Sequence, residues 1–282
     1  MQTDSKFRTK KILGKILIYS TISLALIVVL LPLYWSLSTS IKPGETIFHI
    51  PIEFFPSGFT LQHYVNIFNI IPFSNYLINS AIITGGTLLI SLVFGSIAAY
   101  ALSRYKFPGS GGLLGLIIGA RMIPPVAFVI PLYLMISSFG LLDTHLGVIL
   151  AHCSIVLPFT IWIMKGFFDE LPMDFEEAAL VDGCSRLGAL RVALRLALPG
   201  LFVAAIFGFI ESWNEFMFAL TITRSPASTP ATVGLVGLLQ TPYQIPWGEI
   251  MAGVLLFTLP IFVLGYFVEK YMARVYVVGT IK

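Results

Sequence analysis

Four polar residues inside long apolar stretches are the side chains of this sequence best placed to do chemistry. Arg121 and Glu211 each stand well inside an apolar run, and Asn214 and Glu215 follow Glu211 within about one helical turn. An arginine deep in hydrocarbon costs roughly 2.5–3.5 kcal/mol on insertion scales. We therefore predict that Arg121 pairs with Glu211 or Glu215, or lines a wet pathway. A fixed structural pair is an equally good interpretation, and Asn214 and Glu215 stand near enough to the end of their run to be solvated.

The histidines and cysteines indicate no further chemistry. His145 and His152 share a helical face, but no third ligand is evident, so ordinary polar contacts are favoured over a metal site. Cys153 and Cys184 have no CxxC spacing and are predicted to be free thiols. The sequence also lacks a GxxxxGK[ST] phosphate loop and the HExxH and GxSxG motifs. We expect no catalytic residue, metal or cofactor in this chain.

The composition indicates that a lipid bilayer surrounds most of the chain. It is 57% hydrophobic and 11% charged, whereas soluble domains carry about 25% charged residues. Six apolar segments are long enough to cross about 30 Å of hydrocarbon. They are Ile16–Leu37, Tyr76–Leu102, Leu113–Phe139, Leu146–Met164, Leu198–Thr221 and Ile250–Val268. The sequence therefore predicts an all-α integral membrane protein with six transmembrane helices.

Two residue types shape these apolar segments. Pro124 and Pro125, followed by Pro131, interrupt the third segment, and proline kinks a helix because it removes a backbone hydrogen bond. Small residues in the second segment predict close packing against another helix. They are Gly85, Gly86, Gly95 and Ser96.

The lysines and arginines predict the orientation. With both termini in the cytoplasm, only Lys42 and Arg224 lie outside and Arg121 lies within a span, a strong positive-inside bias. The cations then on the inner side are Lys6, Arg8, Lys10, Lys11, Lys15, Arg104, Lys106, Lys165, Arg186, Arg191, Arg195, Lys270, Arg274 and Lys282. This orientation also places the segment between the fourth and fifth spans in the cytoplasm.

That segment, 165–199, contains six of the fourteen acidic residues and four of the seventeen basic ones, and it has the residues of a helical elbow. Asp174 is predicted to cap a short helix, with Glu177 completing a capping box. Gly183 suits the left-handed turn that ends such a helix. Ser185 can then cap a second helix that leads into the fifth span.

One face of the first elbow helix is predicted to be a contact surface. Phe175, Ala178, Ala179 and Asp182 share this face by helical spacing. The two adjacent alanines would allow another backbone to approach closely. A merely solvated acidic surface is the alternative interpretation of the charges here.

The pattern Glu177-Ala178-Ala179, three residues, then Gly183 resembles the EAA loop of binding-protein-dependent ABC importer permeases. Further stretches are similar to the smaller, MalG-like permease of maltose-type carbohydrate importers. They are Ser40–Pro43, Phe59–Tyr64, Arg121–Pro125, Ile130–Tyr133, Gly140–Thr144 and Ser212–Phe216. After Gly183 the match weakens, because Arg195 and Leu196 stand where the family has Leu-Pro.

The resemblance implies a type I ABC importer permease in a bacterial or archaeal inner membrane. In that family the elbow docks on an ATP-binding subunit, which by position gives docking roles to Glu177, Ala178, Ala179 and Gly183, with Phe175 and Asp182 beside them. The implied partners are a second permease, two ATP-binding subunits that hold ATP and Mg, and an extracytoplasmic substrate-binding protein. Nucleic acid is not an expected partner. The implied function is import of a di- or oligosaccharide through a pathway of which this chain forms half.

The expected organisation has three parts. Residues 1–70 form a cytoplasmic leader, the first span and an outer loop, 71–275 form the transmembrane domain with the elbow at 165–199, and 276–282 form a cytoplasmic tail. A gradient-driven secondary transporter or channel without an ATPase is the alternative function. The absence of a strong internal repeat, which many secondary transporters carry, argues against it. The sequence leaves maltose, trehalose, other oligosaccharides and a polyol or glycerol phosphate open as the substrate.

Overall fold

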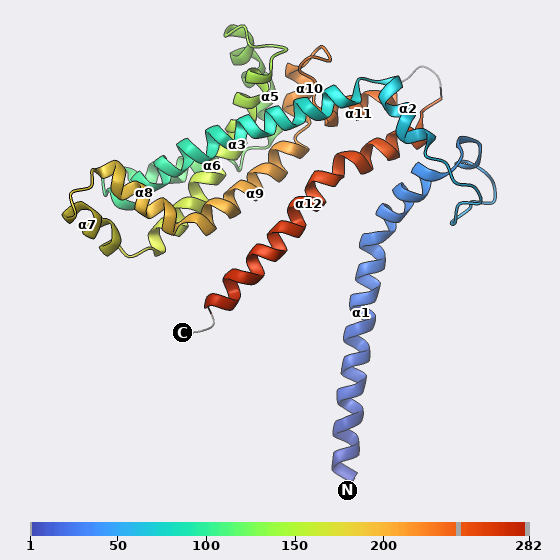
Figure 1. Ribbon diagram of the computed structural model, residues 1–282, viewed down its shortest axis with the longest axis horizontal. Helices are drawn as coiled ribbons and strands as arrows, with labels where there is room; N and C mark the ends of the chain where they lie inside the picture. Colours follow the sequence, from blue (N-terminus) through green and yellow to red (C-terminus); the bar gives the residue numbers. More distant parts are fainter. Residues whose placement is uncertain (1, 241–243, 280–282) are drawn as a thin grey trace. The chain divides into compact units, whose positions relative to one another are not determined.

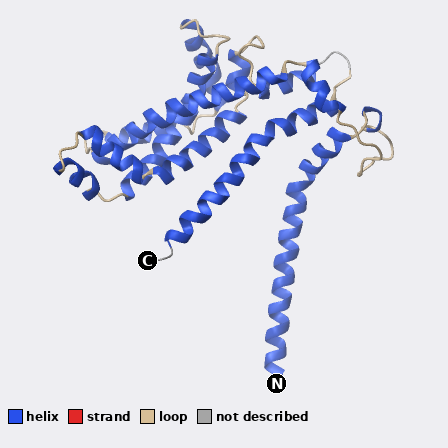
Figure 2. Cartoon of the chain, viewed as in Figure 1, coloured by secondary structure: helices blue, strands red, loops and turns tan. Residues whose placement is uncertain are grey.

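The computed structural model describes residues 2–240 and 244–279, and the side chains of 14–240 and 244–268. Within that range every regular element is helical, so the all-α prediction is confirmed (Figures 1 and 2). The elements are α1 (Gln2–Ile41), η1 (Gly44–Thr46), α2 (Gln62–Ile70), α3 (Phe73–Arg104), α4 (Ser110–Ala120), α5 (Pro125–Ser138), α6 (His145–Glu170), α7 (Asp174–Val181), α8 (Arg186–Leu196), α9 (Leu198–Asn214), α10 (Met217–Ile222), α11 (Ala231–Gly237), η2 (Leu238–Gln240) and α12 (Trp247–Gly279).

Some predictions fall outside the described range. The side chains of Lys6, Arg8, Lys10, Lys11, Lys270, Arg274 and Lys282, predicted on the inner side, are not among those described. The first residues of the predicted tail, 276–279, belong to the end of α12, and 280–282 lie outside the description.

The chain divides into two compact units. One consists of Met1–Ile70 with Leu238–Thr258, and the other of Ile71–Gly237 with Leu259–Lys282. The second unit contains a bundle in which α3, α6 and α9 run side by side (Figure 1).

Four described helices are long and apolar enough to cross a membrane by themselves. They comprise Gly14–Ile41, Phe73–Arg104, His145–Glu170 and Trp247–Val268. Two bent pairs add a fifth and a sixth candidate span: α4 with α5, bent by 99°, and α8 with α9, bent by 72°. The predicted number of six spans is reached only if each bent pair counts as one span, although α8 belongs to the predicted elbow and the predicted fifth span comprises α9 and α10.

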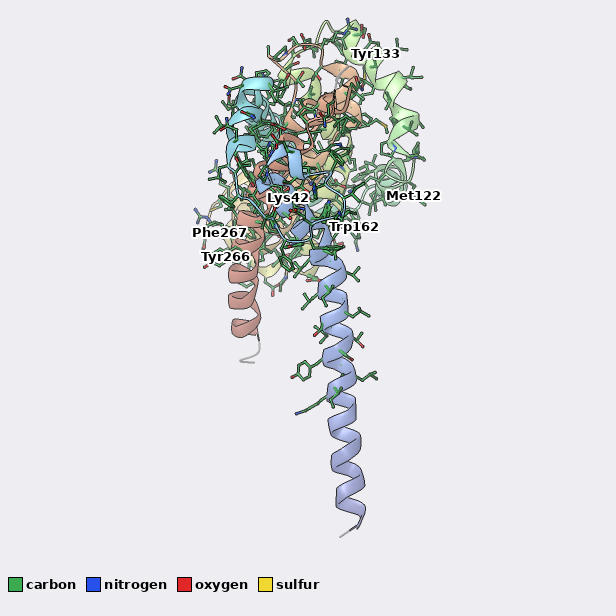
Figure 3. The ribbon with its side chains drawn as sticks, turned by 90° about the vertical axis from the view of Figure 1, so that its right-hand side faces the viewer. Lys42, Met122, Tyr133, Trp162, Tyr266 and Phe267 are labelled. Atoms are coloured by element: carbon green, nitrogen blue, oxygen red, sulfur yellow. The ribbon has the colours of Figure 1, made fainter. Side chains whose placement is uncertain are left out.

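The third predicted span, Leu113–Phe139, is interrupted at Pro124-Pro125 as predicted, but by a full break and not by a kink. α4 ends at Ala120, and Arg121 to Pro124 turn the chain before α5 begins with Pro125 at its first position. Proline disfavours helical geometry in the residue before it, so the Pro124-Pro125 pair breaks the helix instead of bending it. Met122 lies in this link at the edge of the bundle and is 84% exposed (Figure 3).

The fifth predicted span, Leu198–Thr221, is also two helices. α9 ends at Asn214, Glu215 is extended with ψ 133°, and α10 starts at Met217. No proline or glycine marks this break. It coincides with the polar residues that follow Glu211.

The core of the second unit is built mainly where α3 meets α6. A Cβ on Gly95 would lie 2.7 Å from Thr160 Cγ2, and one on Gly86 would lie 2.6 Å from Ile149 Cδ1. The predicted close packing is therefore confirmed at these two glycines, while Gly85 has open space around it. Apolar clusters lie at both ends of this contact. One contains Ile83, Ile136, Val148, Phe218 and Ile222, and the other Ala99, Ile161, Met164, Phe168 and Ala204.

A polar cluster organises the first unit. Lys42 is buried, and its ammonium group donates to the carbonyl oxygen of Glu53. The His63 ring bridges the Lys42 carbonyl oxygen at 2.9 Å and Glu249 Oε1 at 3.0 Å, and Asn66 also donates to Glu249 at 3.1 Å. The loop that follows α1 is thereby tied to the first turn of α12.

Candidate functional site

A cavity of about 490 Å³ lies between the two helix breaks of the second unit. The α4–α5 break, the α9–α10 break and the middle of α6 provide its walls. The lining residues are Ala120, Arg121, Ile123, Pro125, Phe128, Ser154, Ile155, Glu211, Asn214, Glu215, Phe216, Met217 and Phe218. All four polar residues singled out in the sequence therefore line a single cavity.

Arg121 and Glu211 form an ion pair across this cavity wall. Arg121 directly follows α4, and its guanidinium carbon lies 4.5 Å from the centre of the Phe159 ring. Glu211 lies on α9, and its second oxygen, Oε2, is buried with no hydrogen-bond partner among the described residues. The side chains are 26% and 31% exposed, so neither charge is fully withdrawn from the cavity.

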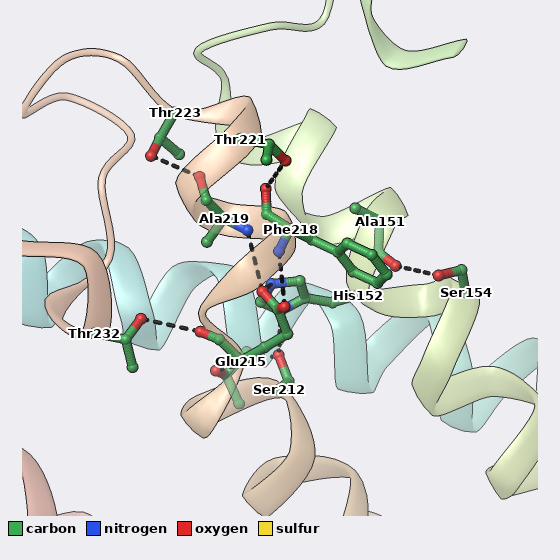
Figure 4. Close-up of polar contacts among 11 residues, drawn as sticks. Ala151, His152, Ser154, Ser212, Glu215, Phe218, Ala219, Thr221, Thr223 and Thr232 are labelled. Carbon is green, nitrogen blue, oxygen red and sulfur yellow. Dashed lines mark hydrogen bonds and ion pairs between the residues drawn. The ribbon is translucent and has the colours of Figure 1, made fainter. Parts of the chain in front are cut away.

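Glu215 has a different role from the predicted ones. Its Oε1 accepts from the Phe218 N–H at 2.8 Å and its Oε2 from the Ala219 N–H at 3.1 Å, so the carboxylate caps the start of α10 (Figure 4). His152 Nε2 lies 3.0 Å from the same Oε2, and a carboxylate only accepts, so this ring nitrogen carries a proton. Of the two predicted partners of Arg121, Glu211 is therefore the one that pairs with it. The Glu215 side chain is only 9% exposed, so the alternative prediction that it is solvated is wrong.

Other predicted polar residues make local contacts. Asn214 is exposed and donates to the Ile210 carbonyl oxygen at 2.8 Å. His145 Nε2 lies 2.8 Å from Asn79 Oδ1, and His152 Nδ1 lies 2.9 Å from Ser212 Oγ, which confirms ordinary polar contacts for both histidines. Cys153 is buried and Cys184 is exposed, and both thiols are free.

The elbow occupies the end of the bundle that is distant from α5 and α10 (Figure 1). Gly183 has φ +86°, the left-handed conformation that was predicted. The Cys184 N–H bonds to the Ala179 carbonyl oxygen at 2.9 Å and the Gly183 N–H to that of Leu180 at 3.1 Å, which is the hydrogen-bond pattern of a Schellman cap. Ser185 Oγ accepts from the Gly188 N–H at 3.3 Å, so the predicted cap of α8 is also confirmed.

The predicted capping role of Asp174 is wrong. The preceding residue, Met173, is already helical with φ −70° and ψ −20°, and its side chain makes no cap hydrogen bond. The N–H groups of Glu176 and Glu177 bond to the Met173 carbonyl oxygen at 2.9 and 3.0 Å. Because the chain enters α7 in helical geometry, Asp174 occupies the first turn and not the cap.

The exposed side of α7 contains most of the predicted contact residues. Phe175 is 51% exposed, and Glu177, Ala178 and Asp182 are exposed as well. Ala179 is only 9% exposed and faces inward, so its predicted place on the shared surface is wrong.

Sequence reasoning missed the residue that holds the elbow to the bundle, Glu176. Its carboxylate lies 2.7 Å from the Arg104 guanidinium and accepts from Tyr100 Oη at 2.7 Å. Arg104 also donates to the carbonyl oxygens of Phe168 and Leu171, at 2.8 and 3.2 Å. The end of α3 therefore binds both the end of α6 and the start of α7.

A second polar clamp lies at the other end of the bundle, where Asp143 has φ +57°. Its Oδ1 accepts from the N–H groups of Arg224 and Ser225, at 2.9 and 3.0 Å, and from the Ser228 hydroxyl at 2.5 Å. Burial raises the pKa of Asp143, but these hydrogen bonds outweigh burial and hold the pKa below its usual range. The clamp joins the loop before α6 to the loop after α10.

Comparison with known proteins identifies one family. Residues 91–276 match the family described as "Binding-protein-dependent transport system inner membrane component". This range includes both helix breaks, the cavity and the elbow.

Individual relatives match over almost the whole chain. The Escherichia coli inner membrane ABC transporter permease protein YcjP is 32% identical, over 97% of this chain and 98% of its own. The trehalose transport system permease protein SugB of Mycobacterium tuberculosis is 36% identical, over 90% and 92%. The trehalose/maltose transport system permease protein MalG of Thermococcus litoralis is 32% identical, over 97% and 99%.

The fold also matches solved structures. A chain of a bacterial ABC transporter involved in the import of the acidic polysaccharide alginate has a TM-score of 0.80 and 25% identity, and the match covers 94% of this chain and 98% of that one. A bacterial alginate ABC transporter in complex with an alginate pentasaccharide-bound periplasmic protein has a TM-score of 0.67 at 16% identity, a likeness of fold.

Proposed function

Because the chain belongs to the family of binding-protein-dependent transport system inner membrane components, we propose that it is the smaller permease subunit of an ATP-driven importer of di- or oligosaccharides. The observation that carries the proposal is the arrangement of one bundle with a mainly apolar cavity, which Arg121, Glu211 and Asn214 also line, between two broken helices, and an exposed elbow at its far end. The protein is a multi-pass component of the inner membrane.

The chemistry of the cavity suits a sugar. Pyranose rings present apolar faces to aromatic side chains and hydroxyl groups to polar ones. Phe128, Phe216 and Phe218 supply aromatic surface, and Arg121 and Asn214 supply donors. Relatives named for trehalose, maltose and diacetylchitobiose support the carbohydrate class. The cavity forms half of the pathway, and a second permease completes it as a heterodimer.

The elbow is the proposed contact with an ATP-binding subunit. Phe175, Glu177, Ala178 and Asp182 present the docking surface, while Gly183 fixes the turn behind them. ATP and Mg bind on the partner ATPase subunits, and this chain catalyses nothing itself. An extracytoplasmic substrate-binding protein delivers the sugar from the opposite side of the membrane.

Two connections transmit movement from the elbow to the cavity. α8 leads directly into α9, whose last turns contribute Glu211 and Asn214 to the cavity wall. Glu176 holds α7 to Arg104 at the end of α3. When ATP binding draws the two ATPase subunits together, the elbow moves with them and α9 shifts the cavity wall. Hydrolysis of ATP returns the elbow to its first position.

This assignment places the elbow and both termini in the cytoplasm. It also retains the division into a leader with first span and outer loop (1–70), a transmembrane domain (71–275) and a short tail (276–282). The fourteen inner-side cations agree with this orientation.

A charge reversal on the elbow tests the proposal. In cells or vesicles that contain the whole importer, Glu177→Lys is expected to abolish ATP-dependent sugar uptake and to reduce co-purification of the ATPase. Glu170→Lys, a reversal at an exposed acid that ends α6, is the matched control and is expected to retain both. Uptake that runs on an ion gradient without ATP and survives Glu177→Lys would instead identify a secondary transporter or channel.

A further inference from the structure

The charged residues that line the cavity differ in their hydrogen bonding and in their exposure. They are Arg121, Glu211 and Glu215. The Glu215 carboxylate already accepts from two backbone N–H groups and from His152, and its side chain is 9% exposed. Arg121 and Glu211 are 26% and 31% exposed, so they are the charges that a solute in the cavity meets.

These two charges compensate each other. The Arg121 guanidinium contacts Glu211 Oε1, while Oε2 has no partner among the described residues. The Phe159 ring lies over the guanidinium group and contributes no charge. Within the described residues, Arg121 is therefore the counter-charge of Glu211, and removal of either leaves one unit charge in the cavity wall.

A single wall charge would act strongly on a charged solute. In a cleft with walls of low dielectric constant, the interaction between unit charges is several times larger than in bulk water. A paired wall leaves only the short-range field of a dipole, which an uncharged sugar with many hydroxyl groups tolerates. A sugar carboxylate gains no net attraction from this wall to offset its loss of hydration.

We propose that Glu211 is a specificity-determining residue, which neutralises Arg121 in the cavity wall and thereby selects uncharged saccharides over acidic ones. The proposal rests on the proposed function of the cavity as a sugar passage. An unpaired Arg121 would turn the same cavity into one that favours anions.

The local charge can be measured with a thiol placed in the cavity of the assembled importer. Ser154 lines the same cavity and is exposed, so we choose Ser154→Cys in a background of Cys153→Ala and Cys184→Ser. The rates of modification by an anionic, a cationic and a neutral methanethiosulfonate are then compared, each divided by its rate with a free thiol.

With the native pair, the anionic and cationic reagents are expected to react at similar relative rates. Glu211→Gln is expected to raise the ratio of anionic to cationic rates by about tenfold, the order expected for unit charges across a partly wet cavity. Arg121→Gln should lower the ratio by a similar factor. The double variant, with both changes, should restore the native ratio and thereby excludes a general disturbance of the fold.

The native Cys184 is the matched control, because it is exposed at the elbow and not in the cavity. Measured with Ser154 unchanged, its ratio of rates should not respond to Glu211→Gln. If all three reagents reach the Ser154→Cys thiol but neither single variant changes the ratio, the specificity proposal is wrong while the passage stands. If no reagent reaches that thiol, the cavity is not a wet passage, and the proposed function of the cavity fails first.

Discussion

Replacement of Glu176 by glutamine is expected to loosen the elbow without changing its shape. Glutamine has nearly the same volume and can still accept from Tyr100 Oη, but it carries no charge for Arg104. The two charged side chains are 8% and 7% exposed, so solvent does little to screen the loss.

The size of the effect follows from the burial of the pair. Removal of one partner from a buried ion pair costs about 3–5 kcal/mol, because the other charge stays buried. Arg104 keeps two carbonyl acceptors, Phe168 and Leu171, which places the expected cost at the lower end. A loss of about 3 kcal/mol corresponds to roughly 150-fold in the equilibrium for local opening of α7.

Amide hydrogen exchange of the detergent-solubilised protein measures this opening. Glu176→Gln should accelerate exchange across α7 by roughly two orders of magnitude, with much smaller changes in α9. Glu177→Gln is the matched control, since that side chain is exposed and should leave exchange within about threefold. Exchange in α7 that stays within threefold after Glu176→Gln, or that rises equally throughout the bundle, would refute the assigned role.

Three further changes probe other features. Gly183→Ala should destabilise the elbow by roughly 1–2 kcal/mol, because a φ of +86° strains an L-residue even though no atom lies near the added Cβ. Hydrogen exchange of the elbow measures this loss of stability, and Gly183→Asn should show a smaller loss than Gly183→Ala. Gly147→Ala should cost about 1–3 kcal/mol in thermal unfolding, because its Cβ would overlap the Leu141 carbonyl oxygen, whereas Gly115→Ala, with open space, should not destabilise. Asp143→Ala should remove three hydrogen bonds at a cost of about 1–3 kcal/mol. The pKa of Asp143 in the folded protein lies below its ordinary 3.8, so its stabilisation is complete above pH 3.8 and is lost as the pH falls through the folded pKa. Asp143→Asn should therefore reduce the loss of stability at acid pH. An unchanged dependence of stability on acid pH would assign it to other groups.

Sequence length and polarity predicted the long helices well and the broken ones poorly. An apolar run of about twenty residues or more identifies α1, α3, α6 and α12, because hydropathy averaged over a window reports whether a segment can lie in lipid. The same average does not report whether the backbone is continuous. Pro124 and Pro125 indicated an interruption at the first break, which we interpreted from the sequence as a kink. No residue type in the sequence indicated the break at Glu215, because its cause is a carboxylate that accepts hydrogen bonds from the backbone N–H groups of Phe218 and Ala219.

The elbow shows the same division. Gly183 and Ser185 were predictable because their roles depend on the local backbone. Glu176 and Glu177 are adjacent acids, and the spacing of polar and apolar residues does not show which of them faces inward. Which of them faces inward is decided by Arg104, which stands 72 residues earlier in the chain. The exposed charges were visible in the sequence, and the buried one required the fold.

The attachment of α7 through Glu176 has a consequence for exchanging elbows between permeases. A graft of residues 172–185 transfers the donor's residue at position 176, while Arg104 and Tyr100 stay behind in the recipient bundle. A chimera made from the contiguous segment would thus present the donor's docking surface, but its residue 176 would not be matched to the recipient's Arg104 and Tyr100. The transferable part is the outward side of α7 alone, with Glu176 and the inward-facing Ala179 kept from the recipient.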